Sequence, residues 1–163
     1  MDVHFRKHRN RLLKRQDGVV ALEFAILFPL FLLVVAGIVE FGHLFYVRHT
    51  LTNASREGAR AGVVYVSMTD TERIAWAENA AIAAVNNYLK PVDAVGVTHP
   101  RLPGVTLSDP AVQVVAVSGF PAGHSGSAVI VTITATDVLL VLDKFNILSN
   151  PINVTAETTM RLE

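Results

Sequence analysis

An apolar run near the N-terminus sets the strongest limit on how this chain can fold. Residues 24–39 contain no charged side chain, and apolar residues also dominate 19–22 and 41–47. Together these segments supply the ~20 apolar residues that a helix needs to span a bilayer. A helix that is apolar on all sides must be covered by lipid or by other chains. The run therefore predicts a transmembrane helix with Glu23 and Glu40 near its two ends.

The acidic residue at the start of this helix is the clearest candidate functional residue. An ionised carboxylate buried away from water costs several kcal/mol, so a carboxylate inside a membrane helix points to a function. The alternative for Glu23 is a side chain that reaches back to the membrane surface from the helix end. We expect Glu40, at the outer end, to be solvated or paired with Arg48 or His43.

A basic segment comes directly before the apolar run. Residues 1–18 hold six Lys and Arg side chains against two Asp side chains, a net charge of +4 in a chain whose formal total is zero. The positive-inside rule then places residues 1–18 in the cytoplasm and the chain beyond about residue 45 outside. A solvated tail or a nucleic-acid patch is the alternative. No basic face beyond residue 18 supports nucleic-acid binding, and the run is too long for an ordinary secretory signal.

Three segments follow from this pattern. Residues 1–18 form a basic cytoplasmic leader that we expect to be unstructured or frayed. Residues 19–66 form one long helix that spans the membrane in its first part, and residues 67–163 form an exported domain. Pro29 lacks a backbone N–H, so it predicts a kink in the long helix.

The second part of the long helix carries small residues at intervals of four: Ala54, Gly58 and Gly62. Such a stripe lets another helix or a sheet approach closely. The alternative is a helix that frays at these positions, because each glycine costs about 1 kcal/mol relative to alanine.

The exported segment predicts a helix followed by strands. Residues 69–72, Thr-Asp-Thr-Glu, match a capping box, and Pro91 ends the helix that follows. Its predicted inward face consists of Ile74, Ala77, Ala81, Ala84, Val85 and Tyr88. Residues 91–110 read as a loop with a short extended piece at 95–97. Residues 138–148 are a short helix, a crossover loop or a membrane-facing surface.

The last third of the chain has the composition and alternation of β-strands. Residues 111–117 are rich in β-branched side chains, and residues 128–136 and 152–162 alternate apolar with polar side chains. The chain therefore predicts an α+β fold. It consists of a long N-terminal transmembrane helix, a second helix and an antiparallel sheet of about three strands.

Catalytic and metal-binding motifs are missing from the sequence. The chain has no cysteine, which excludes disulfides, thiol nucleophiles and cysteine-based metal sites. Its six histidines lack the spacing of metal ligands, and Ser125 is not in a nucleophile elbow. The glycines at 58 and 62 lack the lysine of a phosphate-binding loop. We expect no enzyme activity, no cofactor and no metal site.

The N-terminal third resembles the TadE-like minor pilins, or pseudopilins, of the tight-adherence (Tad, Flp-type) pilus system, within the type IV pilus superfamily. The resemblance rests on residues 18–30, 37–42 and 48–60, and it covers over a quarter of the chain. It implies that a prepilin peptidase cuts between Gly18 and Val19 on the cytoplasmic face. Glu23 then becomes the fifth residue of the mature chain, followed by Phe24, where major pilins commonly have tyrosine.

The same resemblance implies a role in assembling an adhesive pilus. The partners that it implies are the prepilin peptidase, other pilins, an inner-membrane assembly platform and the lipid bilayer. It implies a single-pass protein of the bacterial inner membrane, with a cytoplasmic N-terminus and a periplasmic or extracellular C-terminal domain. The alternative is an unprocessed, signal-anchored periplasmic binding or scaffold protein, in which Gly18 is only a flexible joint.

Overall fold

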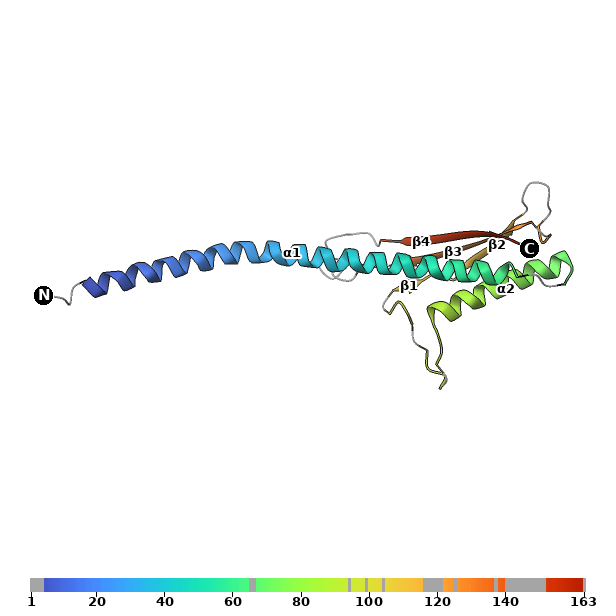
Figure 1. Ribbon diagram of the computed structural model, residues 1–163, viewed down its shortest axis with the longest axis horizontal. Helices are drawn as coiled ribbons and strands as arrows, with labels where there is room; N and C mark the ends of the chain where they lie inside the picture. Colours follow the sequence, from blue (N-terminus) through green and yellow to red (C-terminus); the bar gives the residue numbers. More distant parts are fainter. Residues whose placement is uncertain are drawn as a thin grey trace. The chain divides into compact units, whose positions relative to one another are not determined.

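The computed structural model describes residues 5–64, 67–93, 95–98, 100–103, 105–115, 122–124, 126–136, 138–139 and 152–162, with side chains from residue 18 onward. Two helices and four strands follow one another in the order α1 (Phe5–Gly62), α2 (Asp70–Leu89), β1 (Thr106–Leu107), β2 (Ala111–Val115), β3 (Ala128–Thr136) and β4 (Val154–Arg161) (Figure 1). The predicted α+β class, with a second helix and an antiparallel sheet, is confirmed. The sheet has four strands instead of about three.

Helix α1 begins much earlier than the sequence suggested. Residues 5–18 are helical and continue directly into the apolar run, whereas we expected the leader to be unstructured or frayed. Leucine, lysine and arginine are good helix formers, and extending an existing helix avoids the cost of nucleation. The helix also continues through Pro29 without interruption and ends at Gly62, close to the expected residue 66 (Figure 1).

The chain divides into two compact units, Met1–Phe41 and Gly42–Glu163. From the sequence we expected a domain boundary after residue 66, at the end of the long helix. The second part of α1 belongs to the same compact unit as the sheet, and its Val47, Leu51 and Ala54 are fully buried in the core of that unit.

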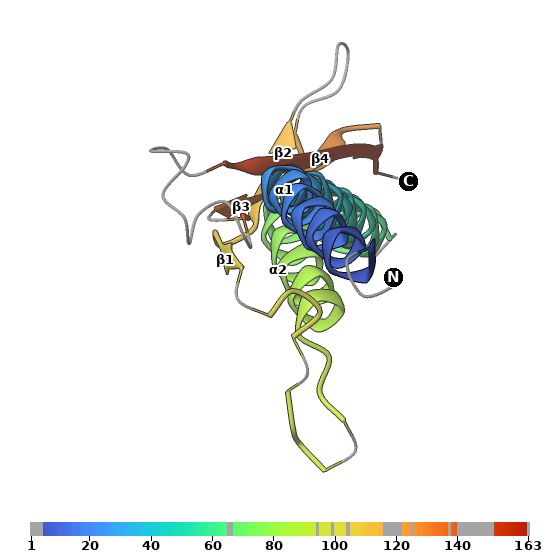
Figure 2. The same ribbon diagram turned by 90° about the vertical axis from the view of Figure 1, so that its left-hand side faces the viewer.

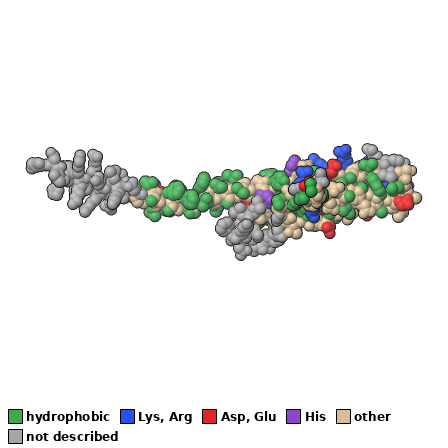
Figure 3. Space-filling view, turned by 90° about the horizontal axis from the view of Figure 1, so that it is seen from below, with side chains coloured by type: hydrophobic (Ala, Val, Ile, Leu, Met, Phe, Trp, Pro, Cys, Tyr) green, Lys and Arg blue, Asp and Glu red, His purple; other side chains and the backbone are tan. Residues whose placement is uncertain are grey.

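The first unit holds the candidate membrane span. From Gly18 onward, α1 is long and apolar enough to cross a bilayer, and none of its most apolar window is buried within the chain. Leu22, Ile26 and Leu33 expose 64%, 67% and 67% of their surface, and Figure 3 shows apolar side chains along this part of the helix. A continuous apolar surface of this extent marks contact with lipid or with other chains.

Strand β3 is the centre of the sheet. It pairs antiparallel with β4 along nearly its whole length, from Ala128↔Arg161 to Ala135↔Val154. On its other edge, β2 pairs with the first half of β3 and β1 with its end, at Thr106↔Thr136 and Leu107↔Ala135. The short β1 therefore continues the edge that β2 begins.

The inward faces of the two long strands follow the predicted alternation. Every second residue of β3 from Val129 to Ala135 is fully buried. In β4 and the residues that flank it, even-numbered side chains point inward and odd-numbered ones are exposed. Both helices lie on the inward face of this sheet, side by side (Figure 2).

Helix α2 begins and ends as predicted. The backbone N–H of Thr69 donates to Glu72 Oε2 at 3.2 Å, and the Thr69 hydroxyl donates to the same oxygen at 2.7 Å, so the capping box is formed. The buried face of α2 consists of Arg73, Ala77, Ala81, Val85 and Leu89. The predicted members Ile74, Ala84 and Tyr88 are only half-buried.

Two loop predictions have different outcomes. Residues 95–97 are not extended: Val95 and Gly96 form a turn, closed by an isolated bridge between Val92 and Thr98. Within residues 138–148, the structure describes only Val138 and Leu139, which have no regular secondary structure. The remaining residues of that stretch lie outside the described parts of the chain.

Candidate functional site

Gly18 and Val19 lie inside α1, so the bond between them is part of a continuous helix. Gly18 is exposed, and a Cβ added to it would meet no atom within 4 Å. Glycine inside a helix costs about 1 kcal/mol relative to alanine. Packing within the described part of the chain therefore gives no reason for glycine at this position, and glycine there makes the helix easier to unwind.

Glu23 lies one helical turn after Val19, on an exposed part of α1. Four residues of helix rise by about 6 Å, and side chains at this spacing lie on the same face. Among the residues whose side chains the structure describes, none forms a hydrogen bond or ion pair with Glu23. The carboxylate is therefore available to a group outside the described chain, or to an amine at position 19.

Phe24 and Pro29 lie in the next turns. The rings of Phe24 and Phe28 stack with centroids 5.3 Å apart and an interplanar angle of 27°, and Phe24 is 64% exposed. Pro29 cannot donate a backbone hydrogen bond, so the carbonyl of Ala25 loses its usual helical partner. The kink that we inferred from Pro29 stays a prediction.

The stripe of Ala54, Gly58 and Gly62 packs inside the second unit. A Cβ at Gly58 would lie 2.5 Å from Val85 Cγ2 and 3.2 Å from the carbonyl oxygen of Ala81. A Cβ at Gly62 would lie 3.0 Å from the carbonyl oxygen of Ala77, and Ala54 is fully buried. The small residues of α1 therefore let α2 approach closely, and the stripe is used within the chain.

Several polar contacts of the second unit have no signal in the sequence. Ser55 Oγ lies 2.7 Å from Thr158 Oγ1 and joins α1 to β4. His43 Nδ1 lies 2.9 Å from the carbonyl oxygen of Val138. Glu40, in the first unit, is only 2% exposed, so it is not solvated, and its pairing with Arg48 or His43 stays a prediction. Each contact depends on residues far apart in sequence, which local patterns do not bring together.

A histidine and an aspartate meet beside the start of α2. His124 Nδ1 lies 2.8 Å from Asp70 Oδ2, and both side chains are about half exposed. No group of three His, Asp or Glu side chains that could hold a metal ion occurs in the described part of the chain. We assign this pair a structural role, because it links the 122–124 loop to α2.

The comparisons with known proteins bear on the same N-terminal segment. The family model described as TadE-like protein matches residues 18–60, about a quarter of the 163-residue chain. The match includes Gly18, Glu23 and Pro29 and ends before Gly62. No curated protein and no solved structure matches the chain. Over residues 18–60 the chain is therefore similar to TadE-like proteins.

Proposed function

We propose that this protein is a minor pilin that a prepilin peptidase cuts between Gly18 and Val19, and that it then takes part in assembling an adhesive Tad pilus. One observation carries the proposal. Glu23 lies exposed, without a partner among the described side chains, one turn after Val19 in the segment that matches the TadE-like family. An unpaired carboxylate at the start of an apolar helix needs a compensating cation.

Cleavage would supply that cation. Hydrolysis of the Gly18–Val19 bond leaves a carboxylate on Gly18 and an α-amine on Val19. A free α-amine is protonated at neutral pH. The new cation lies one helical turn from Glu23 of the same chain, or it meets Glu23 of a neighbouring chain in a filament. Either pairing lowers the cost of holding both charges in an apolar environment.

The helical state of the uncut segment defines what the peptidase must do. A peptidase that takes an extended substrate must first unwind α1 around Gly18, which is helical in the uncut chain. Glycine makes this unwinding easier because it favours the helix least among residues other than proline. The basic residues before Gly18 keep this part of the chain on the cytoplasmic side.

Assembly would use the apolar surface of the first unit. The span beginning at Gly18 exposes large apolar side chains on all sides, which suits lipid before assembly and other pilins after it. The platform of the inner membrane would move the processed chain between these environments. The protein acts in this proposal through binding and not through catalysis, with its second unit outside the membrane.

The terminal residue of protein recovered from membranes tests the proposal. Intact mass should show a start at Val19 in cells with an active prepilin peptidase and at Met1 in cells without it. Gly18→Ala should leave most of the chain uncut, whereas Gly37→Ala should be cut normally. Both glycines are helical, and a Cβ at either would meet no atom within 4 Å, so helix propensity changes equally in the two variants.

The role of the carboxylate needs a second readout. Glu23→Gln should reduce the amount of pilus on the cell surface even where the chain is cut. Glu57→Gln removes an exposed charge further along α1 and should assemble normally. A start at Met1 in wild-type cells with active peptidase would contradict the proposal and favour an unprocessed, signal-anchored protein.

A further inference from the structure

Strand β4 forms one edge of the sheet in the second unit (Figure 1). One side of β4 pairs with β3, and no residue in the described part of the chain pairs with its other side. An edge strand presents unpaired backbone N–H and C=O groups, to which a further strand can bind. The hydrogen bonds around β4 show which of its residues face the open side.

The residue that directly follows β4 gives the first assignment. Leu162 donates its N–H to the carbonyl of Ser127 at 2.7 Å, and its carbonyl accepts from the N–H of Gly126 at 2.8 Å. The backbone groups of Leu162 therefore face the β3 side. Consecutive residues of an antiparallel strand face opposite sides, so the backbone groups that face the open side belong to residues 155, 157, 159 and 161.

Strand β3 supports the same assignment independently. The Ser108 N–H donates to the carbonyl of Thr134 at 2.9 Å, so even-numbered residues of β3 face β1 and β2, and odd-numbered ones face β4. The register sets Val129 opposite Met160, which joins odd-numbered residues of β3 to even-numbered residues of β4. The odd-numbered residues of β4 therefore keep a row of N–H and C=O groups along the open edge.

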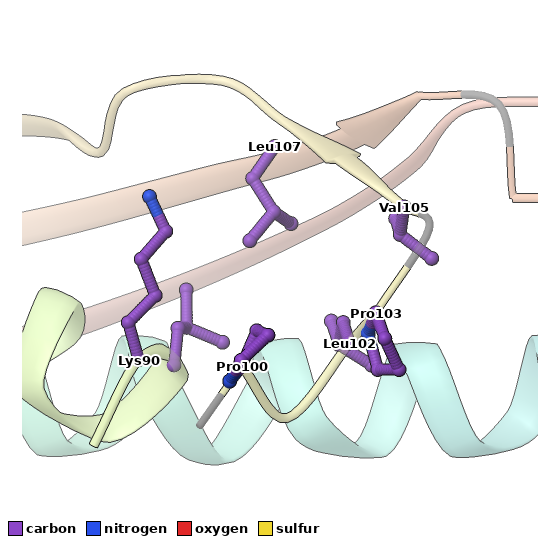
Figure 4. A pocket seen from close by; sticks show the side chains of 7 residues that line it. Lys90, Pro100, Leu102, Pro103, Val105 and Leu107 are labelled. Atoms are coloured by element: carbon purple, nitrogen blue, oxygen red, sulfur yellow. The ribbon is translucent and has the colours of Figure 1, made fainter. Parts of the chain in front are cut away.

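The opposite edge of the sheet is less suited to pairing with another strand. It is broken into β1 and β2 by Ser108, Asp109 and Pro110, and proline has no N–H to donate. Strand β1 also contributes Leu107 to an apolar pocket of about 240 Å³ beside the end of α2 (Figure 4). Strand β4 is unbroken over eight residues. It lacks the proline and the inward-pointing charge that often protect an edge.

The outward side chains of β4 give its edge a charge pattern. Glu157, Thr159 and Arg161 are exposed or half-buried on one face of the strand. The Thr132 hydroxyl donates to Glu157 Oε2 at 3.4 Å. Opposite charges on directly paired residues of neighbouring strands stabilise a sheet, and like charges destabilise it. A complementary antiparallel strand therefore carries an acidic residue opposite Arg161 and, four positions later, a basic residue opposite Glu157.

We propose that the open edge of β4 binds an extended segment of another protein, which adds an antiparallel strand to the sheet. The segment places a carboxylate opposite Arg161, a β-branched residue opposite Thr159 and a cation opposite Glu157. Apolar side chains between them continue the inward face of the sheet. Main-chain hydrogen bonds give such an added strand its affinity, and its side chains give selectivity. This strand addition involves the second unit alone and does not depend on cleavage after Gly18.

A second copy of β4 suits this edge less well than an isolated segment. The 2.7 Å contact between Ser55 and Thr158 places α1 directly against β4. Neighbouring strands lie about 4.8 Å apart, whereas packed helices lie about 8–10 Å apart. Two paired β4 strands would therefore crowd the two α1 helices beneath them, and an extended segment without a helix avoids this.

A synthetic peptide with the complementary pattern, Thr-Thr-Glu-Val-Thr-Val-Arg-Thr-Thr, is the probe. Its central threonine lies opposite Thr159 in the proposed register. Fluorescence anisotropy of the labelled peptide measures its binding to the full chain in detergent. Hydrogen exchange followed by NMR measures the amides of β4. The amides of residues 155, 157, 159 and 161 should exchange rapidly in the free chain and slowly with the peptide bound.

Two N-methylated forms of the peptide test the main-chain pairing without any change to the protein. Methyl groups on the nitrogens of the central threonine and the arginine remove N–H donors that face β4, and should weaken binding about tenfold or more. Methyl groups on the nitrogens of the two valines point away from β4. This matched form should bind about as well as the unmodified peptide.

A charge exchange in the protein tests the side-chain pattern. The double variant Glu157→Arg with Arg161→Glu should bind the original peptide about tenfold more weakly. It should bind a peptide in which glutamate and arginine are exchanged as tightly as the wild type binds the original. This recovery of binding also shows that the variant is folded.

Three other results would contradict the proposal, each in a different way. If the four odd-numbered amides already exchange slowly in the free chain at every concentration, the edge is covered within the chain. If they become protected only as the concentration of the chain rises, the occupant is a second copy. If the wild type binds the exchanged peptide more tightly than the original, the added strand runs parallel. Cleavage after Gly18 is unaffected by any of these results.

Discussion

The hydroxyl of Thr158 lies 2.7 Å from that of Ser55, and Ser55 in turn donates to the carbonyl oxygen of Thr52 at 3.0 Å. Ser55 is fully buried. The Thr158 hydroxyl therefore donates to Ser55 Oγ, and the two bonds form a short chain from β4 into α1. This chain of hydrogen bonds links the second part of the long helix to the sheet.

Removal of one partner should destabilise the second unit. Ser55→Ala leaves the Thr158 hydroxyl without its acceptor in a partly buried place, which costs about 1–3 kcal/mol. The double variant Ser55→Ala with Thr158→Val removes both polar groups. Its loss of unfolding free energy should be smaller than the sum of the losses in the two single variants. Urea unfolding of the full chain in detergent, followed as a double-mutant cycle, measures the coupling. Additive losses would show that the two hydroxyls do not interact.

The close approach of α2 to α1 predicts that Gly58 does not tolerate a side chain. In Gly58→Ala the new methyl would lie 2.5 Å from Val85 Cγ2. The resulting strain, of order 1–3 kcal/mol, should exceed the gain in helix propensity of about 1 kcal/mol. Gly42→Ala is the matched control, because a Cβ there meets nothing within 4 Å. Thermal unfolding should show a lower midpoint for the first variant alone, and Val85→Ala should partly restore it.

Alanine substitutions at two glycines with positive φ distinguish the cost of backbone strain from the cost of a steric clash. Gly96 has φ of +89° with open space around it, whereas Gly123 has φ of +91° and a Cβ added there would lie 2.5 Å from the carbonyl oxygen of Asp70. Gly96→Ala should lower the free energy of unfolding by about 1–2 kcal/mol, which is the cost of placing a residue with a Cβ in the left-handed backbone conformation. Gly123→Ala should cost more, because the loop must also move away from α2. If chemical unfolding shows the same loss of unfolding free energy for both variants, the loop around Gly123 can move away from α2 at no cost.

The parts of the fold that follow from local patterns were predictable. The capping box at Thr69 and Glu72, the stop before Pro91 and the alternation of β4 each depend on neighbouring residues, so the sequence alone contains them. The same holds for the apolar span and for Glu23 at its start. In each case a few adjacent side chains decide the local conformation or the environment.

Other features depend on pairs that only the folded chain brings together. Nothing local indicates that Arg73 faces the core or that Glu40 is buried. The two-residue strand β1 is too short to carry a pattern, and only its pairing with the end of β3 defines it as a strand. The helical leader was missed for a different reason: its charge suggested solvation, whereas its residues are good helix formers attached to a long helix.

The cap of α2 predicts one component of the pH dependence of stability. A hydrogen bond from the Thr69 hydroxyl, together with one from the Thr69 backbone N–H, lowers the pKa of Glu72 below its ordinary value of 4.5. The folded state therefore releases this proton more readily than the unfolded chain does. The contribution of Glu72 to the free energy of unfolding is fully present above pH 4.5. It is lost as the pH falls through the lower pKa that Glu72 has in the folded state.

Variants of the cap isolate this component. Glu72→Gln should flatten the fall in unfolding free energy below pH 4.5, because the titrating group is gone. Glu78→Gln removes an equal charge from the middle of α2 and should leave that part of the profile as in the wild type. Thr69→Ala should also flatten the fall in unfolding free energy below pH 4.5, since it removes the hydroxyl that contributes most to the lowered pKa of Glu72. Unfolding of the three variants in detergent between pH 3 and 7 provides the measurement. If Thr69→Ala shows the same fall in unfolding free energy below pH 4.5 as the wild type, the Thr69 hydroxyl is not the cause of the lowered pKa of Glu72.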